Sequence, residues 1–329
     1  MRCPKACFHL LVLFVLFVLS SCKKELPTID EQAFANAEST ELKSPTQTLI
    51  TTTYGLDYAV GTVATFEQKM KIACVKLVRN QLILSQKISG SYIDQYIKDG
   101  YNVQINLNWS ETTWGAVAYP TDLNKVKAQA EKFFQYYAPN VKSIPVVVVE
   151  NEWDNTAFHK GTIADYVAEL SAITTIGHKY GFKIADGGLS STNLRRWTYS
   201  TLSGDAADTW ANNYFVGPKL DTYPTVIQAV NTYAASINTI PLDYLNVHWY
   251  NVDACYNGFK TASQAYLKAC NKKLIMTNEF GIKTNSDQLF NSTVNEFRGV
   301  ASYAISYSNN NGGGEAISLT DQMIKYLGL

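Results

Sequence analysis

The chain has 329 residues, of which 46% are hydrophobic, and this is enough to bury a sizeable core in one large domain or two smaller ones. Its 28 Lys and Arg residues balance its 28 Asp and Glu residues, so the formal net charge is zero. Without a strong field of either sign, the composition argues against a nucleic-acid-binding protein and against electrostatic recruitment to an anionic membrane.

The N-terminus predicts a secretory signal. Met1–Lys5 is basic, and the apolar run Leu10–Leu19 is too short to span a membrane comfortably as a mature helix. The run ends in Leu19-Ser-Ser-Cys22, which resembles the lipobox of bacterial lipoproteins and implies cleavage before a lipidated Cys22. An uncleaved anchor helix is the alternative. We therefore expect residues 1–21 to be a lipoprotein signal peptide and the mature protein to be attached to a membrane through its N-terminal lipid.

Residues 22–48 are polar and have neither helical nor strand periodicity, so we interpret them as a tether between the lipid and a folded domain. The cysteines left in that domain are Cys74, Cys255 and Cys270, and their spacing is not that of a metal site. Cys74 lies in an apolar run that predicts the core. Cys255 and Cys270 either form a disulfide or are two buried thiols.

Beyond the tether, strand-like and helical segments alternate. Strands are expected at residues 50–56, 75–79, 101–107, 146–152, 182–188, 242–248, 274–279 and 303–307. Helices are expected at residues 65–72, 91–99, 122–137, 162–180, 224–236, 262–269, 291–300 and 321–327. Thr162 with Asp165 predicts a capping box at the start of one of these helices.

This alternation predicts an α/β protein with a (β/α)₈ TIM barrel, formed by a single domain over residues 49–329. The length agrees with such barrels, which usually have about 250 residues. An open doubly wound sheet is the competing architecture. It would more often have a glycine-rich phosphate-binding turn after its first strand, and Tyr54-Gly-Leu-Asp57 is not such a turn.

Two of the strand-like runs end at a carboxylate that directly follows an asparagine, Asn151-Glu152 and Asn278-Glu279. Buried parallel strands are continuous apolar runs, and the active site of a barrel lies at their C-terminal ends. Strands four and seven face each other across the mouth, so Glu152 and Glu279 are candidates for the paired carboxyls of a retaining glycosidase, about 5 to 5.5 Å apart. The alternative is a pair of solvated carboxylates at strand ends.

The neighbours of the two carboxyls suggest different roles for them. Arg79 on strand two and the Tyr250 hydroxyl beyond strand six are expected to stabilise negative charge on Glu279. Glu152, between Asn151 and Trp153, is better placed to keep a proton.

This pattern resembles the retaining glycoside hydrolases of clan A, with family 39 or family 5 as the nearest in character. The resemblance implies that Glu152 is the acid/base and Glu279, before Phe280-Gly281, the nucleophile. It also implies substrate-binding or supporting roles for Arg79, Asn151, His248 and Tyr250. Trp153 occupies the position of the clan's usual proline, Glu150 a position that is usually apolar or aromatic, and no Trp follows strand eight.

All six tryptophans lie near the C-terminal ends of predicted strands or in the loops that follow: Trp109, Trp114, Trp153, Trp197, Trp210 and Trp249. Flat indole faces suit the apolar faces of sugar rings. We expect Trp109, Trp153 and Trp249 to line the substrate cleft, while core packing is at least as good an interpretation of Trp197 and Trp210.

Other catalytic classes lack their signatures. The three histidines beyond the signal are too few and too dispersed for a binuclear metal barrel, and no Gly-x-Ser-x-Gly motif is present. The sequence therefore predicts a lipid-anchored retaining glycoside hydrolase that acts on a poly- or oligosaccharide without a metal or cofactor. We expect it at the outer membrane, facing the periplasm or the cell surface. A non-catalytic carbohydrate-binding lipoprotein on the same barrel is the alternative.

Overall fold

The computed structural model describes residues 50–57, 75–86, 88–89, 92–109, 117–120, 122–156, 158–214, 224–251, 258–282, 292 and 294–306. The predicted signal peptide, the tether and Cys22 lie outside these residues, as do Cys74, Trp114, Cys255 and the predicted helices at 65–72 and 321–327. Cys270 is a buried free thiol. No helix in the described part of the chain is long and apolar enough to cross a membrane.

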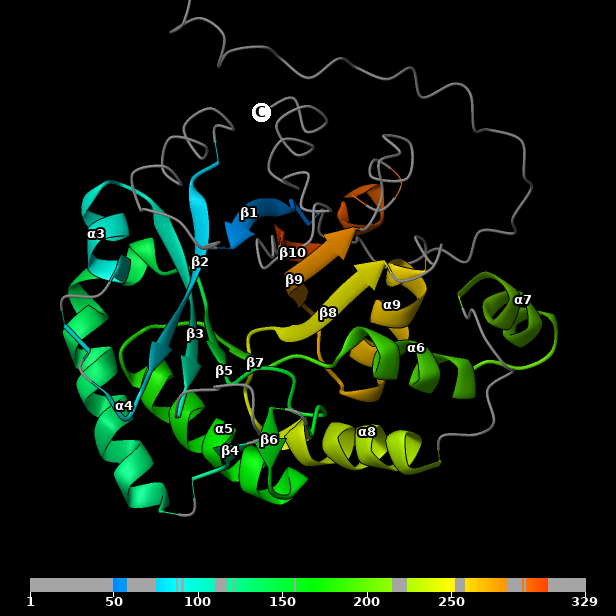
Figure 1. Ribbon diagram of the computed structural model, residues 1–329, viewed down its shortest axis with the longest axis horizontal. Coiled ribbons are helices and arrows are strands. Elements are labelled where there is room, and N and C mark those ends of the chain that lie inside the picture. The colour runs from blue at the N-terminus through cyan, green and yellow to red at the C-terminus, as the bar shows by residue number, and fades with distance from the viewer. Residues whose placement is uncertain are drawn as a thin grey trace, which may run out of the picture.

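Eight parallel strands form one sheet that curls into a (β/α)₈ barrel (Figure 1). In chain order they are β1 (Thr53–Asp57), β2 (Leu77–Ile83), β3 (Asn102–Asn108), β5 (Val147–Val149), β7 (Ile184–Asp186), β8 (Leu245–Asn251), β9 (Ile275–Ile282) and β10 (Ala301–Ser306). The hydrogen-bonded order is β7-β5-β3-β2-β1-β10-β9-β8, and bridges from Ala185 to Tyr244 and from Leu189 to Val247 connect the two ends. The predicted fold class is confirmed.

Helices surround the strands. They are α3 (Tyr92–Lys98), α4 (Leu123–Tyr137), α5 (Ile163–Lys179), α6 (Ser191–Ser200), α7 (Asp205–Tyr214), α8 (Pro224–Ser236) and α9 (Phe259–Ala269), with short 3₁₀ helices η3 (Ala138–Ser143) and η4 (Ile237–Thr239). Helices α3, α4 and α5 cover the β2, β3 and β5 side, while α6, α8 and α9 cover the β8 side (Figure 1).

Helices α6 and α7 were not predicted, nor was a small second sheet of β4 (Val117–Ala118) and β6 (His159–Lys160). The α6 sequence is mostly polar, and the buried face that includes Leu194 and Trp197 also contains Ser191, Arg195 and Thr198, so few apolar residues mark the helix. Tertiary contacts hold it instead: the Trp197 indole N–H donates to Asn231 Oδ1 (2.9 Å) and the Trp210 indole N–H to the Arg195 carbonyl (3.2 Å).

The capping box predicted for α5 is present. The Asp165 backbone N–H donates to Thr162 Oγ1 (3.2 Å), and the Thr162 backbone N–H donates to Asp165 Oδ2 (2.8 Å). Two of the amides that a helix start leaves unpaired are thereby satisfied, so the start of α5 is fixed by its own sequence.

The strands present different surfaces on their two faces. Outward residues such as Val103, Ile105 and Leu107 pack against the helices. The inward face begins with a small apolar cluster of Val146, Val148, Ala185, Tyr244 and Met276. Beyond it toward the C-terminal ends, the interior is polar and almost fully buried, with Gln104, Asn106, Asn246, His248 and Asn278. These amide and imidazole groups support the mouth of the barrel.

Between Met276 and Glu279, strand β9 carries one more residue than the paired segment of β8. Asn246 pairs with Met276 and His248 with Glu279, so two steps along β8 match three along β9. The same local offset appears against β10, where Ala304 pairs with Thr277 and Ser306 with Phe280, after an opposite shift between Ala301 and Ala304. Such a bulge changes the direction of the following side chains. It allows two consecutive residues, Asn278 and Glu279, both to face the interior.

Candidate active site

The C-terminal mouth of the barrel brings together six of the side chains singled out in the sequence. Four strands contribute them, and they are Arg79 from β2, Asn151 and Glu152 after β5, His248 and Tyr250 from β8, and Glu279 from β9. Hydrogen bonds link Glu279 with Arg79, Asn151 and Tyr250, and another links His248 with Glu152. The two groups meet where His248 Nδ1 lies 3.8 Å from Glu279 Oε2.

Glu279 is held by two donors. Arg79 Nη1 lies 2.8 Å from Glu279 Oε2, and the Tyr250 hydroxyl donates to Glu279 Oε1. The Tyr250 ring can approach this closely because residue 281 is glycine: a Cβ there would lie 2.8 Å from ring carbons of Tyr250. The carboxylate of Glu279 is therefore fixed in orientation.

The pKa of Glu279 is below its usual value. Burial alone would raise this pKa, but the charges of His248 and Arg79 and the hydrogen bonds from Tyr250 and Arg79 outweigh it. Glu279 is thus ionised at neutral pH, as an attacking group must be.

Glu152 occupies a different environment. Its Oε1 lies 2.8 Å from His248 Nδ1, and its Oε2 accepts from Asn155 Nδ2 at 2.7 Å. Its backbone has a φ of 43° and Glu150 a φ of 66°, both in the left-handed region that non-glycine residues seldom adopt. Such strain is typical of functional sites. It turns the chain sharply after β5, and the Glu152 N–H donates to the Gly187 carbonyl (2.9 Å).

The two carboxyls are close to each other. His248 Nδ1 lies 2.8 Å from Glu152 Oε1 and 3.8 Å from Glu279 Oε2, so these oxygens are separated by at most the sum of the two distances. The full sum would require the three atoms to lie on a straight line. The pair is therefore far inside the limit of about 9.5 Å beyond which two carboxyls cease to act on one glycosidic bond.

The hydrogen-bond network fixes the protonation of one nitrogen of His248. The Asn278 backbone N–H donates to Asn246 Oδ1 (3.0 Å), so Asn246 Nδ2 is the atom that donates to Asn278 Oδ1 (2.6 Å). Asn278 Oδ1 is then an acceptor, and His248 Nε2, 3.0 Å away, must carry a hydrogen to bond to it.

It follows that one proton lies between His248 Nδ1 and Glu152 Oε1. A neutral ring protonated at Nε2 has a lone pair at Nδ1, so a 2.8 Å contact with a carboxyl requires either a protonated Glu152 or an imidazolium. Burial lowers the pKa of His248, but the carboxyls of Glu279 and Glu152 raise it above the ordinary value overall. The pair thus holds a proton next to the negative charge of Glu279.

Asn106 and Asn151 join this cluster to the barrel interior. Asn106 Oδ1 accepts from Asn278 Nδ2 (2.8 Å) and from Gln104 Nε2 (2.9 Å). Asn151 Oδ1 accepts from Arg79 Nη2 (3.2 Å). The orientation of Asn151 is therefore set by the same arginine that holds Glu279.

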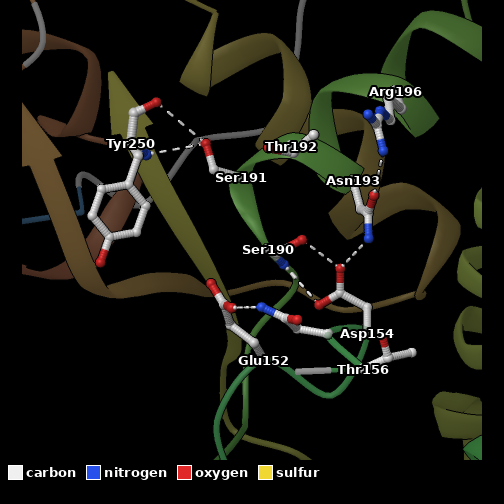
Figure 2. Close-up of a pocket in the computed structure, with 10 residues that line it drawn as sticks. Glu152, Asp154, Thr156, Ser190, Ser191, Thr192, Asn193, Arg196 and Tyr250 are labelled. Carbon is white, nitrogen blue, oxygen red and sulfur yellow. Dashed lines mark hydrogen bonds between the residues drawn. The ribbon is translucent and has the colours of Figure 1, made fainter. Parts of the chain in front are cut away.

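A cavity of about 400 Å³ opens beside Glu152 and Tyr250 (Figure 2). Its other walls come from the turn after β5 and from the start of α6, and every lining side chain can form hydrogen bonds. Asp154 organises these walls, accepting from Ser190 N (2.9 Å), Ser190 Oγ (2.5 Å) and Asn193 Nδ2 (2.7 Å). Glu279 is not among the lining residues, so the cavity lies on the Glu152 side of the cluster.

Two of the three tryptophans predicted to line the cleft do not do so. Trp249 is 0% exposed because it alternates with His248 and Tyr250 and so points to the helix layer, where it contacts Phe259 and the Arg195 guanidinium. Trp153 is 6% exposed and stacks on Tyr233, with ring centroids 4.0 Å apart. Both predictions were wrong.

The other three tryptophans of the described chain differ in burial. Trp109 is half-buried at the end of β3, with Lys125 Nζ 5.8 Å from its ring centroid. Trp197 and Trp210 are buried, which agrees with the core interpretation. Trp109 is therefore the tryptophan of the described chain that is best placed to meet a ligand at the mouth.

Several supporting residues were missed from the sequence, among them Asn106, Asn246, Asp154, Asn155 and Glu169. A signal for two of them existed: polar residues alternate along β3 (Gln104, Asn106, Asn108) and β8 (Asn246, His248, Tyr250). Polar residues at every second position of a central strand indicate a polar interior face.

Among the described residues, no group of three or more His, Cys, Asp or Glu side chains is arranged to hold a metal ion.

Neither a protein-family model nor a curated protein sequence matches this chain. Among solved structures, a glucosidase from Croceicoccus marinus is similar over 81% of this chain and 61% of its own, with a TM-score of 0.57 and 13% identity. A family 39 glycoside hydrolase from the gut symbiont Bacteroides cellulosilyticus WH2 is similar over 80% of this chain and 58% of its own, with a TM-score of 0.52 and 11% identity.

The chain thus spans about three fifths of the length of these two structures. At such low identity the similarity establishes the fold. The predicted resemblance to glycoside hydrolase barrels is confirmed at that level.

Proposed function

We propose that this protein is a retaining glycoside hydrolase that cleaves an O-glycosidic bond of a poly- or oligosaccharide through a glycosyl-enzyme intermediate. The observation that carries the proposal is the contact of both carboxyls with His248 Nδ1, because it limits their separation. The limit lies at the lower edge of the inverting range, about 6.5 to 9.5 Å, and any bend at Nδ1 brings the pair toward the retaining separation of about 5 to 5.5 Å.

In this mechanism Glu279 attacks the anomeric carbon, and its low pKa keeps it ionised for that purpose. Glu152 gives the proton that lies between it and His248 to the departing oxygen, and then takes a proton from the water that releases the sugar. Asn151, held by Arg79, would meet the sugar 2-hydroxyl.

The polar cavity supports a carbohydrate rather than an apolar ligand. It borders the proton donor and not the attacking group, so it would receive the part of the substrate that leaves. Hydroxyl, amide and guanidinium side chains around it match the hydroxyl groups of a sugar.

The test uses alanine variants of the two carboxyls and a panel of polysaccharides and aryl glycosides. Glu279→Ala should abolish turnover on all glycosides, and azide or formate should restore part of it by entering the vacated space. Glu152→Ala should lose activity on substrates with poor leaving groups but keep the first step on activated aryl glycosides. Near-normal turnover of the natural glycan by both variants would contradict the proposal and favour a carbohydrate-binding protein.

We also propose that the protein is lipid-anchored through Cys22, at the outer membrane and facing the periplasm or the cell surface. The basic start, the short apolar run and the lipobox-like Leu19-Ser-Ser-Cys22 support this placement.

A further inference from the structure

Two buried carboxyl groups lie behind the catalytic pair and take no part in the mechanism above. Glu150 follows β5 and is 3% exposed; Glu169 lies on the inner face of α5 and is 0% exposed. Burying a carboxylate without a compensating partner is costly, so the pair needs a physical explanation.

Glu150 is bonded to the backbone of the active-site mouth. Its Oε1 accepts from the Trp109 backbone N–H at 2.6 Å, and its own N–H donates to the Leu107 carbonyl at 3.0 Å. It therefore joins the end of β3 to the strained turn that carries Asn151 and Glu152.

The nearest titratable groups do not neutralise Glu150. His159 Nε2 donates to the Asn151 carbonyl (2.5 Å), because a carbonyl can only accept, and burial lowers the pKa of His159. Its Nδ1, 4.0 Å from Glu150 Oε2, is then without a proton. The Tyr119 hydroxyl donates to the Trp153 carbonyl and the Tyr166 hydroxyl to the Val149 carbonyl.

Glu169 lies three residues after Tyr166 on α5, and the Tyr166 hydroxyl donates to the carbonyl of Val149, the residue before Glu150 (3.1 Å). This places the two buried carboxyls at the same end of β5, and each affects the pKa of the other. In the geometry shown, however, neither Glu169 oxygen has a hydrogen-bonding partner among the described side chains and backbone. Two carboxylates cannot bond to each other because neither can donate. A single proton placed between them supplies the donor and removes one of the two charges.

We propose that Glu150 and Glu169 form a buried acid pair that shares a proton and acts as a positioning device for the turn bearing Asn151 and Glu152. The proton keeps the two carboxyls together, and through Glu150 it ties α5 to the β3 and β5 strand ends. The catalytic half of this proposal rests on the proposed function, whereas the shared proton does not.

The shared proton has a predictable effect on stability. Burial is the main cause that raises the pKa of Glu150 to about 7, and burial and the neighbouring Glu150 charge raise that of Glu169 well above its ordinary value. Both groups hold protons more tightly in the folded than in the unfolded chain. Their contribution is therefore fully present below the unfolded pKa and is lost as pH rises through the folded value.

The first experiment measures the melting temperature of the whole protein between about pH 5 and about pH 8. Wild type should melt lower as pH rises. In Glu169→Gln the amide can donate to Glu150 at every pH, and the negative charge of residue 169 is gone. The decrease in melting temperature between the two pH values should therefore be smaller than in wild type by at least about 2 °C. Equal falls in wild type and variant would overturn the shared proton.

Glu131→Gln is the matched control. Glu131 is half-exposed, and hydrogen bonds from Lys179 and Tyr180 lower its pKa, so its contribution to stability is lost as pH falls and not as pH rises. The control variant should show the same decrease in melting temperature as the wild type. If Glu169→Gln does not fold, Glu150→Gln serves instead, because its amide oxygen still accepts from Trp109 N and its amide nitrogen can donate to Glu169.

The second experiment tests positioning. Glu150→Ala removes the link to Trp109 and should lower kcat by about 10²-fold with a smaller change in KM, since a misplacement of about 1 Å has this cost. Glu150→Gln should restore most of kcat. An unchanged kcat in Glu150→Ala would refute the positioning role. If the wild type has no glycosidase activity, the proposed function fails, and the melting experiment still decides whether the pair shares a proton.

Discussion

One nitrogen of His248 contacts both carboxyls of the candidate pair, at 2.8 and 3.8 Å. Its position makes the two groups interdependent: a proton near Nδ1 is available to Glu152 and at the same time lowers the pKa of Glu279. The asymmetry between acid and nucleophile thus comes from surrounding groups, because the two side chains are chemically identical. His248 is buried in the interior, so its protonation is governed by these contacts more than by solvent.

Tyr250→Phe tests how much the phenol contributes to the state of Glu279. The hydroxyl donates to Glu279 and lowers its pKa, so its removal should raise that pKa and move the acid limb of kcat/KM to higher pH. A hydrogen bond to a charged group contributes about 1.5 to 3 kcal/mol, equivalent to about one to two pH units. A pH–rate profile of wild type and variant measures the shift. An unmoved acid limb would show that Tyr250 does not set the ionisation of Glu279.

The contrast between Trp109 and Trp249 gives a second test. Trp249→Ala removes a wholly buried indole and should cost about 3 to 5 kcal/mol of unfolding free energy. Trp109→Ala, at a half-buried residue, should cost less and should instead raise KM for oligosaccharides. Denaturant melts and initial-rate kinetics separate the two effects, and the reverse pattern would place the sugar platform at Trp249.

These residues also show where sequence reasoning reached its limit. That Glu152 and Glu279 lie toward the C-terminal ends of their strands followed from where apolar runs stop, but the predicted end of the strand at Glu279 was wrong, because β9 continues to Ile282. The direction of Trp249 could have been inferred from its neighbours, because His248 and Tyr250 on either side face the interior. The direction of Trp153 could not have been inferred in this way. The turn after β5 has no regular strand alternation, because Glu150 and Glu152 have positive φ values.

At the scale of elements, α5 connects the proposed acid pair to the helix layer, because it carries Glu169 and packs on both α4 and β7. Its start was predictable from Thr162 and Asp165, whose side chains bond to each other's backbone. Helix α6, which forms one wall of the polar cavity, was not, because its stability comes from tertiary bonds that a local pattern does not encode.

Gly177→Ala is informative at this scale because two effects oppose each other. Alanine favours a helix interior by about 1 kcal/mol over glycine. A Cβ at residue 177 would however lie 2.6 Å from Ile184 Cδ1 and 2.9 Å from Phe134 Cζ, both buried, and overpacking costs about 1 to 3 kcal/mol. We expect net destabilisation, seen as a lower melting temperature. A more stable variant would mean that α5 can move away from β7 and α4.

At the scale of the whole molecule, the barrel interior is divided between a small apolar cluster and a larger polar network. The alternation of strands and helices was enough to predict the barrel. It did not predict the hydrogen bonds from Asn246 to Asn278 and from Asn278 to Asn106, since these pairings join residues on different strands. These hydrogen bonds could not be predicted because they depend on the register between the strands, and that register depends on the bulge in β9.

The predicted lipid anchor also belongs to this scale. Cys22→Ser removes the thiol to which lipid would be attached, so the protein should leave the membrane fraction or accumulate as an unprocessed precursor. A protein that begins near residue 45 should keep the kcat of the full-length form, because the active-site cluster lies within the barrel. Unchanged membrane fractionation of the serine variant would contradict the lipobox interpretation.

The extra residue in β9 limits how such a site can arise. A substitution replaces a side chain but does not change which face of the sheet that residue points to. If β9 were regular and Asn278 faced Asn246 and His248, residue 279 would point to the helix layer, and no side chain at that position could reach a substrate. The extra residue in β9, and not a substitution at residue 279, is therefore what turns that side chain inward. A designer who transplants the two carboxyls onto an idealised barrel would have to transfer the irregular strand with them.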